Sequence, residues 1–174
     1  MGNPVDVADT ILGMMVRTEL EWIYEAAKRM DTIVEIGSYK GRSTYALCAG
    51  CRGQVYAVDP FMAGGYWPDT DSVKDTYPEF MENMKGFANL TVVRMTSEEA
   101  AASGLIPPMV DMVFIDGDHD YAMVKKDLEL WAPRTKKLVC GHDLNVPGVE
   151  QAVMEYYGRE RVHAGAHVIW YVDK

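Results

Sequence analysis

The chain has 174 residues, the length of one ordinary domain, and its 48% hydrophobic and 25% charged residues argue against disorder. A net charge of −9 offers no attraction to a phosphate backbone, which excludes nucleic acid as the expected partner. No apolar run reaches the roughly 18 residues of a membrane span, and the first ten residues lack a signal-peptide pattern. We therefore expect a cytoplasmic protein without membrane contact.

Helix and strand patterns alternate along the chain. Residues 6–30 carry apolar side chains at spacings of three and four, which predicts an N-terminal amphipathic helix over the core or the active site. Near-continuous apolar strands are expected at 32–37, 54–59, 90–95, 110–116 and 137–141. Helices are expected at 43–49, 72–85, 118–131 and 148–157, and Ser97-Glu98-Glu99 opens a further short helix. Strands that alternate with helices predict a parallel sheet covered on both faces, in one α/β domain over residues 1–174.

The chain ends in two short strands within residues 161–172, and no helix separates them. We expect them to pair as a hairpin, so that one of them runs antiparallel to the rest of the sheet. The two histidines of this region, His163 and His167, have no acidic cluster near them in the sequence and are interpreted as structural.

Three cysteines include the pair Cys48-Ala-Gly-Cys51. The spacing is that of a redox pair or of half a zinc site, but no second such pair exists and the motif closes a helix rather than opening one. Two small apolar residues at a helix end are the favoured interpretation.

The first expected strand runs into a glycine-containing loop, Glu35-Ile-Gly37-Ser-Tyr-Lys-Gly41. Glycines let the backbone turn sharply and approach a ligand, and the helix that follows offers free N–H groups. Asp59 ends the second strand, 22 residues after Gly37, where an acid can accept both hydroxyls of a ribose. Together these features predict a nucleoside site. Glu35 would repel a pyrophosphate, so the loop favours a ligand with an ammonium group over a dinucleotide.

Acidic residues and histidines follow the fourth and fifth expected strands. Asp116, Asp118 and His119 come after one strand, and His142 and Asp143 come after the next. Adjacent parallel strands end at the same edge of a sheet, so these side chains should converge, and converging carboxylates favour a bound cation. The alternative is local: Asp118 as a helix cap and Asp143 as a turn residue.

The pattern Glu35-x-Gly37-x-x-x-Gly41 with Asp59 resembles the class I S-adenosylmethionine (SAM) dependent methyltransferases, over nearly the whole chain. The resemblance implies seven strands in the order 3-2-1-4-5-7-6, with strand 7 antiparallel. It places Glu35 and Gly37 near the methionine part of SAM and Asp59 on the ribose. The adenine would lie by Thr96 and Ser97. The full set of implied cofactor residues is Glu35, Gly37, Ser38, Gly41, Ser43, Asp59, Thr96, Ser97 and Asp116.

The run Ile-Asp-Gly-Asp-His-Asp-Tyr at 115–121 is similar to natural-product and sugar O-methyltransferases and, more distantly, to catechol and caffeoyl-CoA O-methyltransferases. The resemblance implies a divalent cation, Mg²⁺ or another, held by Asp116, His142 and Asp143. His142 is a departure, because these families place an acid there. His119 matches the position of the lysine base of the catechol enzymes, so Asp116 and His119 are the predicted catalytic residues.

These observations predict metal-assisted transfer of a methyl group from SAM to a hydroxyl of a small molecule. A metal-free N-methyltransferase and a SAM-binding protein without catalysis stay open, whereas the loop spacing disfavours a nicotinamide-dependent dehydrogenase. Nothing in the sequence selects the acceptor, and a homo-oligomer stays open. The aromatic loop with Tyr66 and Trp67 either lines the substrate pocket or anchors itself to the core.

Overall fold

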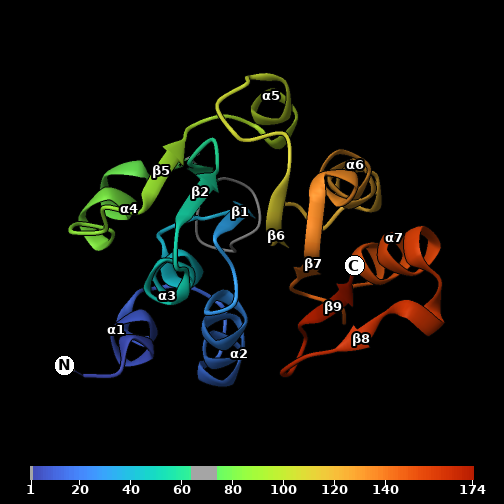
Figure 1. Ribbon diagram of the computed structural model, residues 1–174, viewed down its shortest axis with the longest axis horizontal. Coiled ribbons are helices and arrows are strands. Elements are labelled where there is room, and N and C mark those ends of the chain that lie inside the picture. The colour runs from blue at the N-terminus through green and yellow to red at the C-terminus, as the bar shows by residue number, and fades with distance from the viewer. Residues whose placement is uncertain (1, 64–73) are drawn as a thin grey trace.

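A computed structural model describes residues 2–63 and 74–174. The expected aromatic loop with Tyr66 and Trp67 lies outside these residues. Seven strands form one sheet in the order β5-β2-β1-β6-β7-β9-β8 (Figure 1). The strands are β1 Thr32–Ile36, β2 Gln54–Val58, β5 Leu90–Val93, β6 Val110–Ile115, β7 Thr135–Gly141, β8 His163–Ala164 and β9 Trp170–Asp173.

The predicted strand order and hairpin are confirmed. The first five strands of this sheet pair in parallel, and β9 runs antiparallel to both β7 and β8. A separate two-stranded ribbon pairs β3 (Met62–Ala63) with β4 (Lys74–Asp75). This is the order 3-2-1-4-5-7-6 of a class I SAM-dependent methyltransferase fold.

Two layers of helices bury the two faces of the sheet (Figure 1). Side chains alternate along β1, so that Ile33 packs in the core under α1 to α4, whereas Val34 packs in the core under α5 to α7. The helices are α1 Pro4–Thr10, α2 Arg17–Ala27, α3 Arg42–Gly50, α4 Tyr77–Asn83, α5 Ser97–Ala102, α6 Tyr121–Trp131 and α7 Pro147–Tyr157, with 3₁₀ turns η1 Ala132–Arg134 and η2 Arg159–Arg161.

The expected single helix over residues 6–30 is wrong: two helices, α1 and α2, are separated by residues 11–16. The guanidinium of Arg42, at the start of α3, binds the segment between the two helices. It donates to the carbonyls of Asp9 and Ile11 at 2.6 Å and of Met15 at 2.8 Å, and it pairs with the Asp9 carboxylate at 2.5 Å. These carbonyls therefore find their donors outside the helix.

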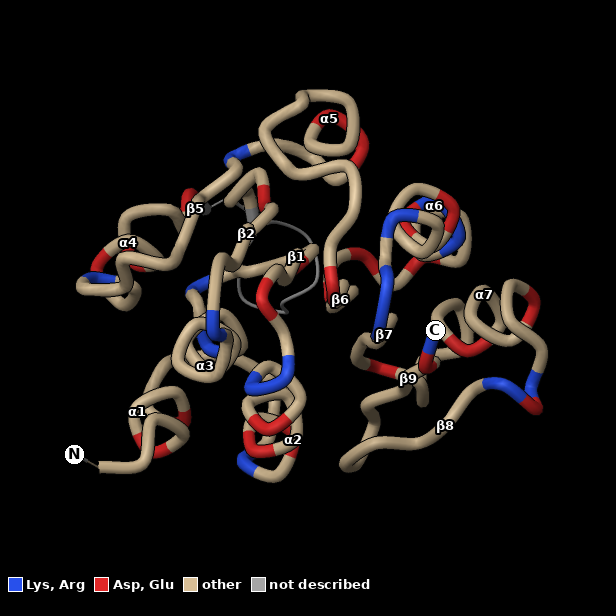
Figure 2. Tube along the Cα trace, viewed as in Figure 1, with Lys and Arg blue, Asp and Glu red and all other residues tan. Residues whose placement is uncertain are grey.

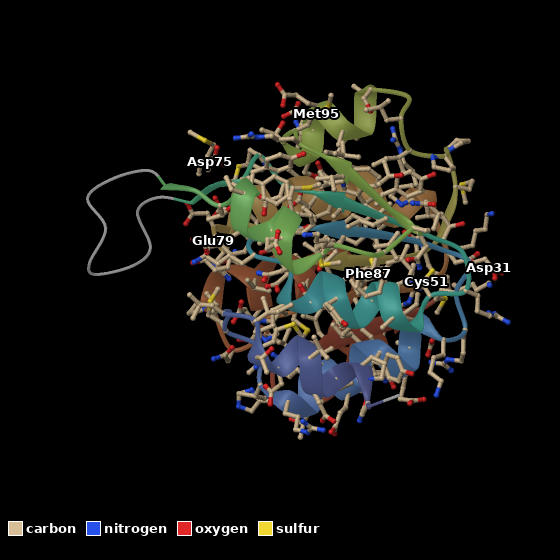
Figure 3. All side chains as sticks on the ribbon, turned by 90° about the vertical axis from the view of Figure 1, so that its left-hand side faces the viewer. Asp31, Cys51, Asp75, Glu79, Phe87 and Met95 are labelled. Atoms are coloured by element: carbon tan, nitrogen blue, oxygen red, sulfur yellow. The ribbon has the colours of Figure 1, made fainter. Side chains whose placement is uncertain are left out.

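The two ends of the sheet differ in chemistry. Cys51 and Asp31 precede β2 and β1, and Figure 3 places them at the opposite end of the sheet from Asp75 and Glu79. Both Cys48 and Cys51 are buried free thiols, and burial raises the pKa of each. The Cys-x-x-Cys pair therefore packs the helix end away from the motif-bearing loops.

Lys and Arg are dispersed over many elements among the more numerous acids (Figure 2). Within residues 2–63 and 74–174, every helix is too short or too polar to cross a membrane.

Candidate active site

The loops after β1, β2, β6 and β7 meet at the carboxyl edge of the sheet, because all four strands run parallel. Gly37, after β1, has φ of +87°, and a Cβ placed there would lie 2.1 Å from the carbonyl oxygen of Asp116. Only glycine allows this approach. The predicted cofactor loop and the predicted catalytic acid are therefore in backbone contact.

Glu35 is fully buried at the end of β1. Its Oε2 accepts hydrogen bonds from Ser38 Oγ at 2.8 Å and Thr44 Oγ1 at 2.5 Å, whereas its Oε1 has no partner among the described residues. Burial raises the pKa of the Glu35 carboxyl to about 7, although the hydroxyls of Ser43, Thr44 and Ser38 oppose the rise. A buried carboxyl with an unpaired oxygen favours a cationic partner.

Asp59, after β2, holds the glycine loop in place. Its Oδ2 accepts from the backbone N–H groups of Ser38 and Tyr39 at 2.8 Å each, and its Oδ1 accepts from Phe61 N–H at 2.5 Å. A carboxylate can accept about four hydrogen bonds, so some capacity is left for a ligand hydroxyl. Asp59 therefore has a loop-ordering role that the sequence did not reveal.

Other predicted cofactor residues lie at helix starts. Gly41 is the N-cap of α3 with φ of +92°, and Ser43 is buried in the first turn of that helix. Thr96 caps α5 in a reciprocal pair with Glu99. Ser97 Oγ accepts a hydrogen bond from the indole of Trp131 at 2.8 Å, so its hydroxyl joins α5 to α6.

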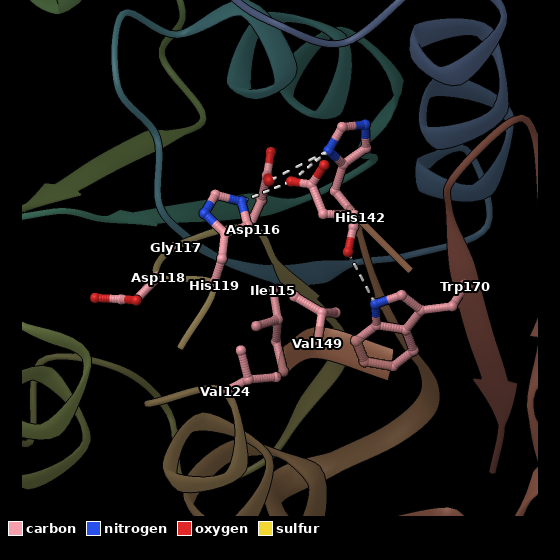
Figure 4. A pocket seen from close by; sticks show the side chains of 10 residues that line it. Ile115, Asp116, Gly117, Asp118, His119, Val124, His142, Val149 and Trp170 are labelled. Atoms are coloured by element: carbon pink, nitrogen blue, oxygen red, sulfur yellow. Dashed lines mark hydrogen bonds and ion pairs between the residues drawn. The ribbon is translucent and has the colours of Figure 1, made fainter. Parts of the chain in front are cut away.

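The acids and histidines after β6 and β7 converge as predicted, around a small pocket (Figure 4). Asp143 Oδ2 lies 2.7 Å from Nε2 of His119 and 3.0 Å from Nδ1 of His142. The same Nδ1 lies 3.6 Å from Asp116 Oδ1. Asp118 stays local: its Oδ1 accepts from Asp120 N–H at 2.8 Å, and α6 begins only at Tyr121.

Each charge in this cluster changes the pKa of its neighbours. Burial lowers the pKa of His142, but hydrogen bonds to Asp143 and Glu19 outweigh it and raise the pKa to about 10. The hydrogen bond to Asp143 raises the pKa of His119. Burial raises the pKa of Asp116 to about 7, reinforced by Asp143 and opposed by His142. Burial also acts to raise the pKa of Asp143, but the two imidazoles outweigh it and hold that pKa well below its usual range.

Sequence reasoning missed Glu19. This carboxylate, on α2, is 1% exposed, and its Oε1 lies 3.0 Å from His142 Nε2. Glu19 Oε1 also lies 3.1 Å from His167 Nδ1. His167, interpreted from the sequence as structural, therefore contacts the carboxylate that pairs with His142. A signal was present, because Glu19 falls within the apolar stripe of its helix, three residues after Val16 and four before Ile23.

Asp116, His142 and Asp143 each offer one ligand atom, and these atoms lie within 4.8 Å of one another. The donor set of two carboxylates and an imidazole therefore fits a divalent cation. The unpaired, buried Oε1 of Glu35 suits the ammonium group of an amino acid moiety.

The model of a methyltransferase-domain family matches residues 34–143, which span all the loops described above. The chain belongs to this methyltransferase family. A curated relative, the uncharacterized protein y4gI of Sinorhizobium fredii, is 24% identical over 141 residues. That alignment covers 78% of this chain, but the chain spans only 15% of the relative's length.

Solved structures share the fold of this methyltransferase domain. The O-methyltransferase from Bacillus cereus in complex with SAH matches with a TM-score of 0.68 and 15% identity, over 98% of this chain and 87% of that one. The O-methyltransferase TomG from Streptomyces achromogenes in complex with SAM matches at 0.69 and 13% identity, over 100% and 91%. Cofactor-bound Rv0187 from MTB matches at 0.70 and 16% identity, over 98% and 85%.

Proposed function

We propose that this chain is a SAM-dependent O-methyltransferase that transfers a methyl group to a hydroxyl of a small molecule with the help of a divalent cation. One observation carries the proposal: the cluster of His119, Asp143, His142 and Asp116 lies at the sheet edge that also holds the Gly37 turn. A methyl donor on the turn and an acceptor at the cluster would be neighbours, as in-line transfer requires.

The assignment of the cofactor site rests on the residues that follow β1 and β2. SAM supplies an electrophilic methyl group on a sulfonium when it is bound. We assign Glu35 to its ammonium group, Gly37, Ser38, Gly41 and Ser43 to the turn around its methionine part, and Asp59 to its ribose. The assignment of Thr96 and Ser97 to the adenine rests on the resemblance alone, since both side chains make local hydrogen bonds.

His119 is the proposed general base. Transfer would break the acceptor's O–H bond and the S–CH₃ bond of SAM and form an O–CH₃ bond. The proton would move to the imidazole, and the sulfur would leave as the neutral thioether of S-adenosylhomocysteine. Asp143, 2.7 Å from Nε2, orients the ring and stabilises its protonated form. Because the same contact raises the pKa of His119, turnover should increase with pH as the neutral imidazole becomes populated.

The proposed ion site is Asp116, His142 and Asp143, where a cation would orient the acceptor and lower the pKa of its hydroxyl. The deciding experiment follows the transfer of labelled methyl from SAM to a panel of catechols, phenols and polyols. Activity that chelator abolishes and a divalent cation restores would support the proposal. SAM binding without transfer to any hydroxyl, under any ion, would contradict it.

A metal-free N-methyltransferase is the second candidate. It is favoured by one observation: both imidazoles lie within 3.0 Å of Asp143 Oδ2, so they can balance the charge of this carboxylate. In that case the cluster positions an amine acceptor. Methyl transfer to amines at full rate in excess chelator distinguishes this candidate from the first.

A further inference from the structure

The buried carboxylate of Glu19 has no part in the chemistry proposed above. It belongs to α2, which is remote in sequence from the strand ends, yet it contacts the side of His142 that faces away from Asp116 and Asp143. His142 is 6% exposed and spans the gap between these groups, with Nε2 toward Glu19 and Nδ1 toward the two aspartates. The imidazole is therefore fixed from both sides.

Glu19 is itself held by four contacts. Its Oε2 accepts from Val16 N–H at 2.7 Å. Its Oε1, besides its contact with His142, lies 3.1 Å from His167 Nδ1 and accepts from Val168 N–H at 3.3 Å. His167 adopts φ of +50°, an uncommon conformation for a non-glycine residue, in the turn before β9. A carboxylate held this firmly can impose one orientation on the imidazole beside it.

The distances from His142 Nδ1 to the carboxylate oxygens of Asp116 and Asp143 suit a bound ion. Neighbouring ligand atoms around an octahedral ion with bonds of about 2.1 Å lie about 3.0 Å apart. The Nδ1 of His142 lies 3.0 Å from Asp143 Oδ2 and 3.6 Å from Asp116 Oδ1. The Asp116 carboxylate is 18% exposed and lines the same pocket as His142 and Asp143. A metal-bound histidine commonly donates its other N–H to a carboxylate. Glu19 Oε1 lies 3.0 Å from Nε2 of His142 as an ion pair, and Nε2 has no aligned hydrogen-bond partner among the described residues, so Glu19 is the carboxylate within reach of that nitrogen.

We propose that Glu19 is a positioning residue that presents Nδ1 of His142 to the ion, and that the site therefore selects a first-row transition metal over Mg²⁺. This inference rests on the proposed divalent-cation site and specifies the class of its ion. Mg²⁺ prefers oxygen ligands, whereas an imidazole suits Zn²⁺, Co²⁺ and their neighbours.

The test uses the purified full chain, stripped with chelator, and titrates it with Co²⁺, Zn²⁺ and Mg²⁺ by calorimetry. We expect the wild type to bind Co²⁺ at least tenfold more tightly than Mg²⁺. His142→Asp, which restores an all-oxygen set, should lower that ratio at least tenfold. Equal affinity for Co²⁺ and Mg²⁺ in the wild type, or no binding of either, would overturn the inference.

Glu19→Gln tests the positioning role. An amide cannot accept from both Val16 N–H and His142, so Co²⁺ affinity should fall about 10- to 100-fold. Glu21→Gln, an exposed position on the same helix that pairs with Arg17, is the matched control and should bind Co²⁺ like the wild type. Wild-type affinity in Glu19→Gln would contradict the role. If that variant fails to fold, the His142→Asp comparison and the following measurement still decide.

Nitrogen NMR of the Zn²⁺-loaded wild type gives a readout that a merely structural glutamate would not move. We expect the His142 signals of a metal-bound Nδ1 and a protonated Nε2; an ion on Nε2, or on no nitrogen of His142, would refute the proposal. The proposed function is tested separately. Methyl transfer to a hydroxyl in excess chelator would keep the methyltransferase and remove the cation from its reaction. Absence of SAM binding would remove the methyltransferase, and the metal titrations would still decide the metal inference.

Discussion

The buried carboxyl of Glu35 makes a prediction about stability as well as about binding. Its pKa is raised from 4.5 to about 7 in the folded protein, and it is fully buried. Between these values the unfolded chain has released the proton while the folded chain keeps it. Stability must therefore fall as the pH rises, by about 1.4 kcal/mol per pH unit, or about 3 kcal/mol across the window.

Glu35→Gln removes this titration and keeps an oxygen that can accept from Ser38 and Thr44. The free energy of unfolding, measured in urea from pH 4.5 to pH 8, should lose about 3 kcal/mol more in the wild type than in the variant. Asp116 titrates in both proteins, and the charge of Glu35 acts to raise its pKa, so the difference between the two curves reports Glu35 together with this coupling. Parallel curves would refute the reasoning.

The affinity for SAM should increase with pH, whereas the stability decreases. A cationic amino group favours the ionised carboxylate, so the affinity of the wild type for SAM should increase with pH up to about 7 and then level off. The affinity of Glu35→Gln should be weaker and should increase less with pH than that of the wild type, since Asp116 still titrates in the variant. Calorimetry at pH 5.5 and pH 8 measures both, and an unchanged affinity in the variant would remove Glu35 from the cofactor site.

Three further predictions concern single residues. His119→Ala should lower turnover about 10²- to 10⁴-fold while SAM affinity is unchanged, and a normal turnover number with a lower melting temperature would end the base assignment. Asp59→Asn leaves one side-chain oxygen for three backbone N–H groups. This variant should bind SAM about tenfold more weakly, and its free energy of unfolding should be lower by about 1–2 kcal/mol. Wild-type affinity in calorimetry would argue against a ribose contact. Arg42→Ala leaves half-buried carbonyls without a donor and should cost about 2–4 kcal/mol in urea unfolding, whereas Arg17→Ala, at an exposed position, should cost less than about 1 kcal/mol.

The fold could be predicted because its signals are local. The apolar runs that became β1 and β6 are short and lie between helical patterns, and such alternation allows few arrangements other than a parallel, doubly covered sheet. The meeting of Asp116 with His142 and Asp143 follows from the same rule, since parallel neighbours end at one edge. The acceptor molecule could not be predicted, because no local pattern encodes the shape of its pocket.

The tertiary structure decided which partners these side chains have. Arg42 donates to a carbonyl between α1 and α2, and Ser97 Oγ accepts from the indole of Trp131. Asp59, predicted to bind a ribose, also accepts from the backbone of the loop after β1. Glu19 reaches His142 only because α2 packs beside the end of β7, a relation that depends on how whole elements dock. Periodicity determines which face of a helix is buried, but not what a buried charge will meet, since that depends on contacts between segments far apart in the chain.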